Sequence, residues 1–83
     1  MPADLLNNFD RLHTTILGAQ RISHNLGLNP QDSLENVVMW CKQAIKNSRN
    51  IIRKGKNWYA YVDNIVITIN AHSFTIITAH QLK

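Results

Sequence analysis

Cysteine, glycine, proline and acidic residues are all scarce in this chain, and each shortage narrows the class of protein. The 83 residues include one Cys, three Gly, two Pro and five Asp or Glu. A lone Cys41 can form neither an internal disulfide nor a cysteine-pair metal site, which is typical of a protein in a reducing compartment. Few Gly and Pro together with 45% hydrophobic residues argue against a disordered chain.

Long apolar segments are also missing. No run approaches the roughly 20 apolar residues of a membrane span, and Met1-Pro2-Ala3-Asp4 lacks the basic and then apolar pattern of a signal peptide. We therefore expect no membrane association and a cytoplasmic location. A mass of 9.5 kDa predicts one domain, residues 1–83, with a single modest core.

The shortage of acidic residues is most pronounced in the middle of the chain. No Asp or Glu occurs between Glu35 and Asp63, and six of the nine cations fall there: Lys42, Lys46, Arg49, Arg53, Lys54 and Lys56. Such a positive field attracts polyanions, of which a phosphate backbone is the commonest in cells. RNA is therefore a possible partner, and the alternative is a solvated basic face that keeps a small protein in solution.

Apolar residues at spacings of three and four predict helix through most of the first 26 residues. The stripe comprises Leu5, Phe9, Leu12, Ile16, Ala19 and Leu26. Thr14 and Thr15 are better at a helix N-terminus than in its interior, so a break near His13 is expected. Gly27 predicts the helix end, with a turn at Asn29-Pro30.

The next helix has the strongest helical pattern of the chain. Asp32 is the predicted N-cap, with Glu35 three positions later as in a capping box. Its expected buried stripe is Leu34, Val37, Val38, Cys41, Ala44 and Ile45. Helices therefore cover about residues 3–47, as two or three segments.

β-Branched and aromatic residues then predict a sheet over about residues 50–80. Four strands are expected, at 51–52, 58–62, 65–69 and 74–79. Connections this short require antiparallel pairing. The fold class is α+β, with two or three N-terminal helices packed on one face of a four-stranded antiparallel meander.

A turn at Asp63-Asn64 would pair Val62 with Ile65. That pairing assigns to the core face Trp58, Ala60, Val62, Ile65, Ile67 and Ile69. The register of the last strand stays open, because a slip of one residue reverses every side chain.

A three-residue last loop would place Thr78 and His80 on the open face with Tyr59 and Thr68. A four-residue loop would instead bury Phe74 and Ile76 with the isoleucines of the core.

The histidines, at positions 13, 24, 72 and 80, lack metal-ligand spacing, so no metal and no cofactor is expected. Metal-free cleavage of a phosphodiester needs a base, an acid and cations that stabilise charge. The catalytic candidates of these types are His72, His80, Lys56 and Thr78. The substrate-binding candidates are Arg53, Lys54, Tyr59, Ser73 and His13. Ordinary roles remain open for several of them: strand propensity for Thr78 and a place beside a helix cap for His13.

Several segments resemble a family of short bacterial proteins of unknown function. They are residues 12–18, Arg21-Ile22, 25–28, 40–42, 53–59, 69–73 and 75–80, which together span most of the chain. A looser likeness is to the metal-independent ribonucleases that include barnase, colicin-type nucleases and RelE-like toxins, since helices precede a four-stranded meander with Thr78 and His80 near its end. That likeness implies RNA cleavage by a few side chains on the sheet.

Two functions follow as hypotheses. The first is a toxin-like, metal-independent endoribonuclease. The second is a non-catalytic module that binds RNA, or a protein such as an antitoxin, through the same basic surface. The oligomeric state is not indicated by the sequence.

Overall fold

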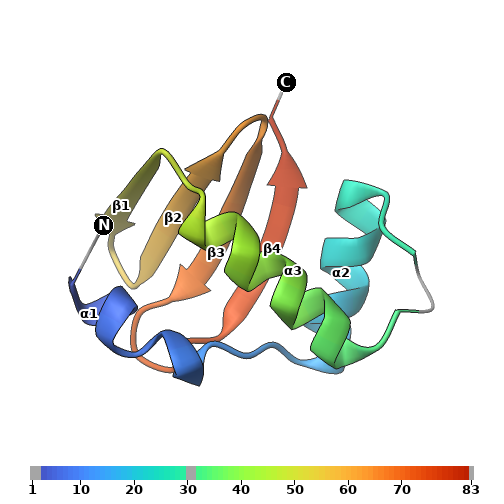
Figure 1. Cartoon of the computed structure of the whole chain (residues 1–83), viewed down its shortest axis with the longest axis horizontal. Coiled ribbons are helices and arrows are strands. Elements are labelled where there is room, and N and C mark those ends of the chain that lie inside the picture. The colour runs from blue at the N-terminus through green and yellow to red at the C-terminus, as the bar shows by residue number, and fades with distance from the viewer. Residues whose placement is uncertain (1–2, 30–31, 83) are drawn as a thin grey trace.

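The computed structural model describes residues 3–29 and 32–82, and its elements follow the order expected for an α+β protein (Figure 1). A short α1 (Ala3–Asn7) and one 3-10 turn (Phe9–Arg11) precede two main helices, α2 (Ile16–Leu26) and α3 (Leu34–Lys46). Four strands follow: β1 (Asn50–Lys54), β2 (Asn57–Val62), β3 (Ile65–Asn70) and β4 (Ile76–Gln81). The predicted break near His13 is confirmed.

The strands form an antiparallel sheet in the order β1-β2-β3-β4, as predicted. Asp63-Asn64 is the β2–β3 turn, and Val62 pairs with Ile65. The β1–β2 turn is Gly55-Lys56, where the sequence favours a turn at Lys54-Gly55. Gly55 and Asp63 have φ of +62° and +50°, the left-handed conformation that tight hairpin turns need.

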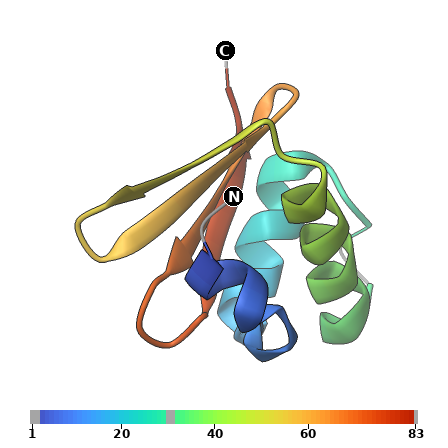
Figure 2. The same cartoon turned by 60° about the vertical axis from the view of Figure 1, so that its left-hand side comes forward.

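All helices of residues 3–29 and 32–82 lie on one side of the sheet, and the other face carries none of them (Figure 2). On the covered side, α2 lies beside β4, and α3 crosses the sheet (Figure 1). The buried core between the layers includes Leu5, Leu12, Ile22, Leu26, Val37, Cys41, Ile45, Trp58, Ala60, Ile67, Ile69 and Ile76. No helix in the described ranges has both the length and the apolar character needed to cross a membrane.

Local signals account for the ends of α2 and α3. Thr15 caps α2 by accepting a hydrogen bond from the Gly18 N–H at 3.0 Å, and Gly27 ends it in the left-handed conformation, φ 68°, as predicted. The predicted cap of α3 was wrong: Ser33, not Asp32, accepts a bond from the N–H of Asn36. Ser33 has the extended backbone of an N-cap residue. The turn predicted at Asn29-Pro30 lies partly outside the described residues.

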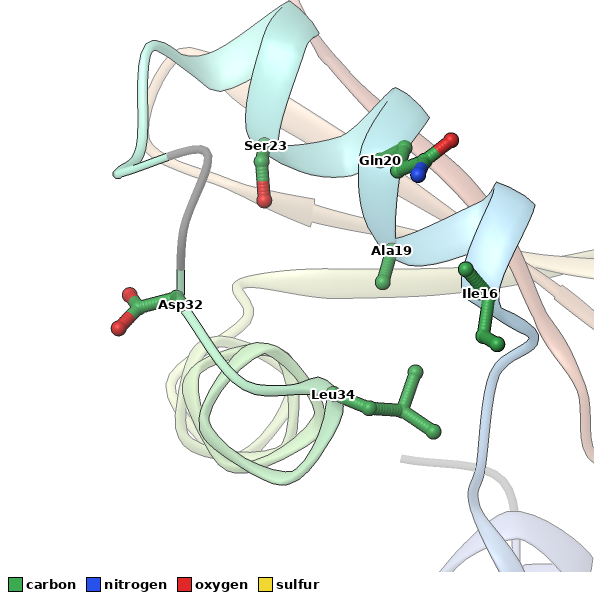
Figure 3. A pocket seen from close by; sticks show the side chains of 6 residues that line it. All are labelled: Ile16, Ala19, Gln20, Ser23, Asp32 and Leu34. Carbon is green, nitrogen blue, oxygen red and sulfur yellow. The ribbon is translucent and has the colours of Figure 1, made fainter.

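Two predicted core positions are instead exposed. Ile16 is 71% and Leu34 40% exposed, and each is the first residue of its helix. They flank a hollow of about 160 Å³ that also involves Ala19, Gln20, Ser23 and Asp32 (Figure 3). None of the predicted site residues lines it.

A β-bulge resolves the register that the sequence left open. Thr68 pairs with Thr78, but Ile69 pairs with Ile76, so Ile77 is the extra residue on β4. The bulge changes the alternation of side chains at that point. Phe74 and Ile76 are therefore buried in the core, and Thr78 and His80 still pair on the open face.

Candidate functional site

The face of the sheet that the helices leave uncovered is here named the open face. The register assigns to it Asn50, Ile52, Lys54, Asn57, Tyr59, Tyr61, Val66, Thr68, Asn70, Thr78 and His80. Tyr59 and Tyr61 are half-buried, two residues apart on β2. No acidic residue belongs to this set, so its formal charge is positive.

Three separate segments meet at one end of this face, here named the loop end. The N–H of Ala71 donates to the carbonyl of Lys56 at 2.8 Å, which joins the β3–β4 loop to the β1–β2 turn. The segment before α2 lies alongside the same loop, because the N–H of His13 donates to the Phe74 carbonyl (3.2 Å) and that of Ile76 to the His13 carbonyl (2.6 Å). Residues far apart in sequence are thereby collected at one end of the sheet.

His13 is held at the loop end by both ring nitrogens. Its Nδ1 lies 2.8 Å from the carbonyl oxygen of Arg11, and because a carbonyl only accepts, Nδ1 carries the hydrogen. In the neutral ring Nε2 is then an acceptor, and the hydroxyl of Thr75 donates to it at 3.1 Å. In this arrangement the Nε2 of the neutral ring is an acceptor that faces the Thr75 hydroxyl.

The hydrogen-bonded network continues from Thr75 into the loop. The Ser73 and Thr75 hydroxyls are 2.7 Å apart. Asn70 Oδ1 accepts from the backbone N–H groups of His72 and Ser73 at 2.9 and 3.0 Å, and the Ser73 hydroxyl lies 3.2 Å away. The side chain of Asn70 thus shapes the loop that presents His72 and Ser73.

Asn57 and Tyr59 extend the polar group along β2. The side-chain amide of Asn57 donates to the Tyr59 hydroxyl at 3.4 Å, and its Oδ1 is buried without a partner among the described residues. An unpaired buried carbonyl is unfavourable by about 1–3 kcal/mol. A donor supplied by a ligand or a rearranged neighbour would relieve that penalty.

Phe74 has a φ of +60°, which is uncommon for a bulky residue and costs on the order of 1 kcal/mol. Packing enforces it: the ring is buried, lies 5.5 Å from that of Trp58, and has the Arg11 guanidinium 4.6 Å above its centroid. Strained backbone of this kind clusters at functional sites. Phe74 lies between Ser73 and Thr75, so its backbone conformation influences the distance between their hydroxyls, which is 2.7 Å.

The loop end brings together most of the predicted site residues. Lys54, Lys56, His72 and His13 are exposed there, and Ser73 belongs to the network. Tyr59 accepts a bond from Asn57, the register partner of Asn70. It does not collect Thr78 or His80: His80 pairs with Val66, four residues from Asn70 along β3, or about 13 Å. The Thr78 hydroxyl receives a 3.4 Å bond from Asn25.

Arg53 lies apart from the other predicted residues. Its register partner is Trp58 of the core face, its guanidinium lies 5.7 Å from the Trp58 ring centroid, and its Nε donates to the Gly55 carbonyl. The arginine therefore covers an aromatic core residue at the sheet edge instead of facing the other cations.

Three polar residues of the loop end escaped the sequence reasoning: Asn57, Asn70 and Thr75. Asn57 and Asn70 pair across β2 and β3. Thr75 lies opposite Asn70, and the Asn70 N–H donates to the Thr75 carbonyl. Asn70 had a readable signal, since an Asn three residues before Ser is typical of a side-chain-stabilised turn. The role of Thr75 depends on the packing of His13 beside it, which no local pattern predicts.

The remaining ionisable chemistry is limited. Burial raises the pKa of the Cys41 thiol to about 12, so this thiol is a core residue and not a nucleophile. No three His, Cys, Asp or Glu side chains are grouped as metal ligands anywhere in residues 3–29 or 32–82.

The fold and site define a small α+β protein in which helices of the described residues cover one face of the sheet, and a histidine-containing polar network lies at one end of the other face. The chain belongs to the family described as "Protein of unknown function (DUF3781)", whose model matches residues 6–80. No curated protein and no solved structure matches it. The expected membership of a family of unknown function is confirmed, whereas these comparisons give no support to the ribonuclease likeness.

Proposed function

We propose that the protein binds single-stranded RNA across the open face and cleaves it at the loop end without a metal ion. The observation that carries this proposal is the convergence of His13, His72, Lys54 and Lys56 beside a hydroxyl network. These groups are of the types that cleavage of a phosphodiester by general acid–base chemistry requires. Lone Cys41, kept as a buried free thiol, fits action in the cytoplasm.

His13 is the proposed base, because its Nε2 already accepts a hydrogen bond from a hydroxyl. A ribose 2′-hydroxyl would replace that of Thr75, which can turn its proton towards Ser73, 2.7 Å away. The proton passes to Nε2 as the 2′-oxygen bonds to phosphorus. The bond to the 5′-oxygen breaks, protonated His72 gives that oxygen a proton, and the products are a 2′,3′-cyclic phosphate and a 5′-hydroxyl end.

The lysines and tyrosines would hold the substrate. Lys54 and Lys56 lie at or beside the β1–β2 turn, where the Lys56 carbonyl joins the catalytic loop, and their ammonium groups suit backbone phosphates. Tyr59 and Tyr61 offer aromatic surface on which bases stack. Thr78 and His80, on the same face towards its other end, would contact nucleotides farther from the cleaved bond.

Binding without cleavage is the second candidate. The backbone N–H groups of the β3–β4 loop are already bonded, those of Ala71, His72, Ser73, Phe74 and Thr75 all having acceptors. Stabilisation of the reacting phosphate would therefore depend on side chains alone. A non-catalytic module would use the same tyrosines and lysines and form a complex with RNA that does not turn over.

A single assay separates the two functions. The purified protein is incubated with a 5′-labelled single-stranded RNA in EDTA, beside His13→Ala, His72→Ala and the matched control His24→Ala, an exposed histidine on α2. We expect the first two variants to lose about 100-fold or more of the cleavage rate and the control to retain it. Salt-sensitive binding without cleavage would establish the second candidate, and neither binding nor cleavage would remove both.

A further inference from the structure

The two edges of the sheet are treated differently by the fold. The β4 edge is closed: the Ile76 N–H donates to the carbonyl of His13 (2.6 Å), the Thr14 hydroxyl donates to the Ile76 carbonyl (2.7 Å), and the Asn25 amide donates to the Ala79 carbonyl (3.2 Å). Unpaired strand edges promote pairing with other chains. This edge is therefore unavailable for further pairing along most of its length.

The β1 edge has no such cover within the described part of the chain. β1 is hydrogen-bonded to β2 alone. The two-residue turn makes Lys54 and Asn57 the first hydrogen-bonded pair, so alternation directs the N–H and C=O groups of Ile51 and Arg53 outward. β1 thus presents a short row of backbone donors and acceptors.

The side chains of β1 determine which strand could add to this row. Arg53 and Lys54 at its end and Arg49 before it are exposed cations, and Ile52 is 44% exposed. Edge cations disfavour self-pairing, because two copies joined here would bring six positive charges together. The same charges favour a strand that carries acidic residues.

We propose that the β1 edge binds an extended acidic segment of a partner protein as a fifth strand. Addition of a peptide strand to an open sheet edge derives its affinity from backbone hydrogen bonds and its specificity from alternate side chains. In antiparallel register, the partner residues opposite Lys54 and Arg53 are acidic, and those opposite Ile52 and Ile51 are β-branched. The recognised sequence is therefore Glu-Glu-Val-Val-Thr, with Thr opposite Asn50.

The test uses three acetylated and amidated peptides and the 15N-labelled full chain at low salt. The first is Ser-Glu-Glu-Val-Val-Thr-Ser. The second replaces both Glu with Lys, and the third replaces both Val with Pro, which keeps the charge but removes strand pairing. The first peptide should bind with a dissociation constant of about 1 mM or tighter, shift the amide signals of residues 49–54, and slow hydrogen exchange at Ile51 and Arg53 about tenfold.

The lysine and proline peptides should each bind about tenfold more weakly than the first. A chain carrying Arg53→Glu and Lys54→Glu, with its fold checked by its NMR spectrum, should reverse the preference and bind the lysine peptide. The proposal is overturned by an absence of saturable binding, by equal binding of the proline peptide, or by shifts centred on Tyr59 and Tyr61. Because no RNA is present, none of these results bears on the proposed function.

Discussion

Gly18 and Thr14 form a contact whose energetic coupling can be measured. A Cβ at Gly18 would overlap the Thr14 hydroxyl oxygen and lie 3.2 Å from that of Thr15. The Thr14 hydroxyl cannot turn away freely, because it donates to the buried Ile76 carbonyl at 2.7 Å. Gly18→Ala therefore forces a displacement that costs about 1–3 kcal/mol, against a gain in helix propensity of about 1 kcal/mol.

The coupling should reverse the sign of this substitution. In a Thr14→Ala background, itself destabilised by about 1–3 kcal/mol through the unpaired Ile76 carbonyl, the overlap is gone. The propensity gain is then opposed only by the 3.2 Å approach to the Thr15 hydroxyl and ordinary van der Waals contact. Gly18→Ala should then stabilise by up to about 1 kcal/mol. Urea unfolding of the four chains, followed by Trp fluorescence, measures the cycle. A coupling energy below about 0.5 kcal/mol would refute the claim that a Cβ at position 18 and the Thr14 hydroxyl compete for the same space.

Three further predictions concern the open face and the core. Tyr59→Ala and Tyr61→Ala should each weaken binding of single-stranded RNA by about 1–3 kcal/mol, with Phe replacements close to wild type; fluorescence anisotropy measures this, and equal losses for Ala and Phe would contradict stacking. Lys54→Ala and Lys56→Ala should each lower the slope of log affinity against log salt by about one, and an unchanged slope would place these lysines away from phosphate. Since burial raises the Cys41 pKa from 9.0 to about 12, the unfolded state loses the thiol proton first as pH rises. The free energy of unfolding should therefore fall between those pH values more steeply than in Cys41→Ala, and equal slopes would contradict the burial effect.

The sequence predicted best what local chemistry determines. Thr15 and Gly27 mark the ends of α2 because a hydroxyl and a missing Cβ suit those positions, whatever the rest of the fold does. Asp63-Asn64 determined the β2–β3 register, since a two-residue turn leaves one pairing. These features depend on a few neighbouring residues.

The errors arose where two nearby residues competed or where tertiary packing decided. Asp32 and Ser33 are both good caps, and in the structure Ser33 has the extended backbone and accepts the bond from the Asn36 N–H. Ile16 fits the helical stripe, but it is the first residue of α2 and is 71% exposed.

The candidate site was predictable in its residue types and not in its grouping. His13 and Ser73 join one network because Thr75 lies between them, and that contact links segments 62 residues apart. The bulge at Ile77 could not be predicted from the two-residue repeat either. A strict repeat allows one register or the other along the whole strand, whereas the bulge joins the two registers within β4.

The closure of the β4 edge has a consequence for synthesis. Sixty-two residues separate Thr14 from Ile76, so the Thr14 hydroxyl lacks its acceptor until β4 has left the ribosome. At about 5–20 residues per second, synthesis of the intervening residues delays this hydrogen bond by several seconds. The nascent chain can pair β1 with β2 and β2 with β3 during that time, but β3 remains an edge strand until β4 arrives. Slow translation of β4 would lengthen the interval in which β3 is open to pairing with other chains.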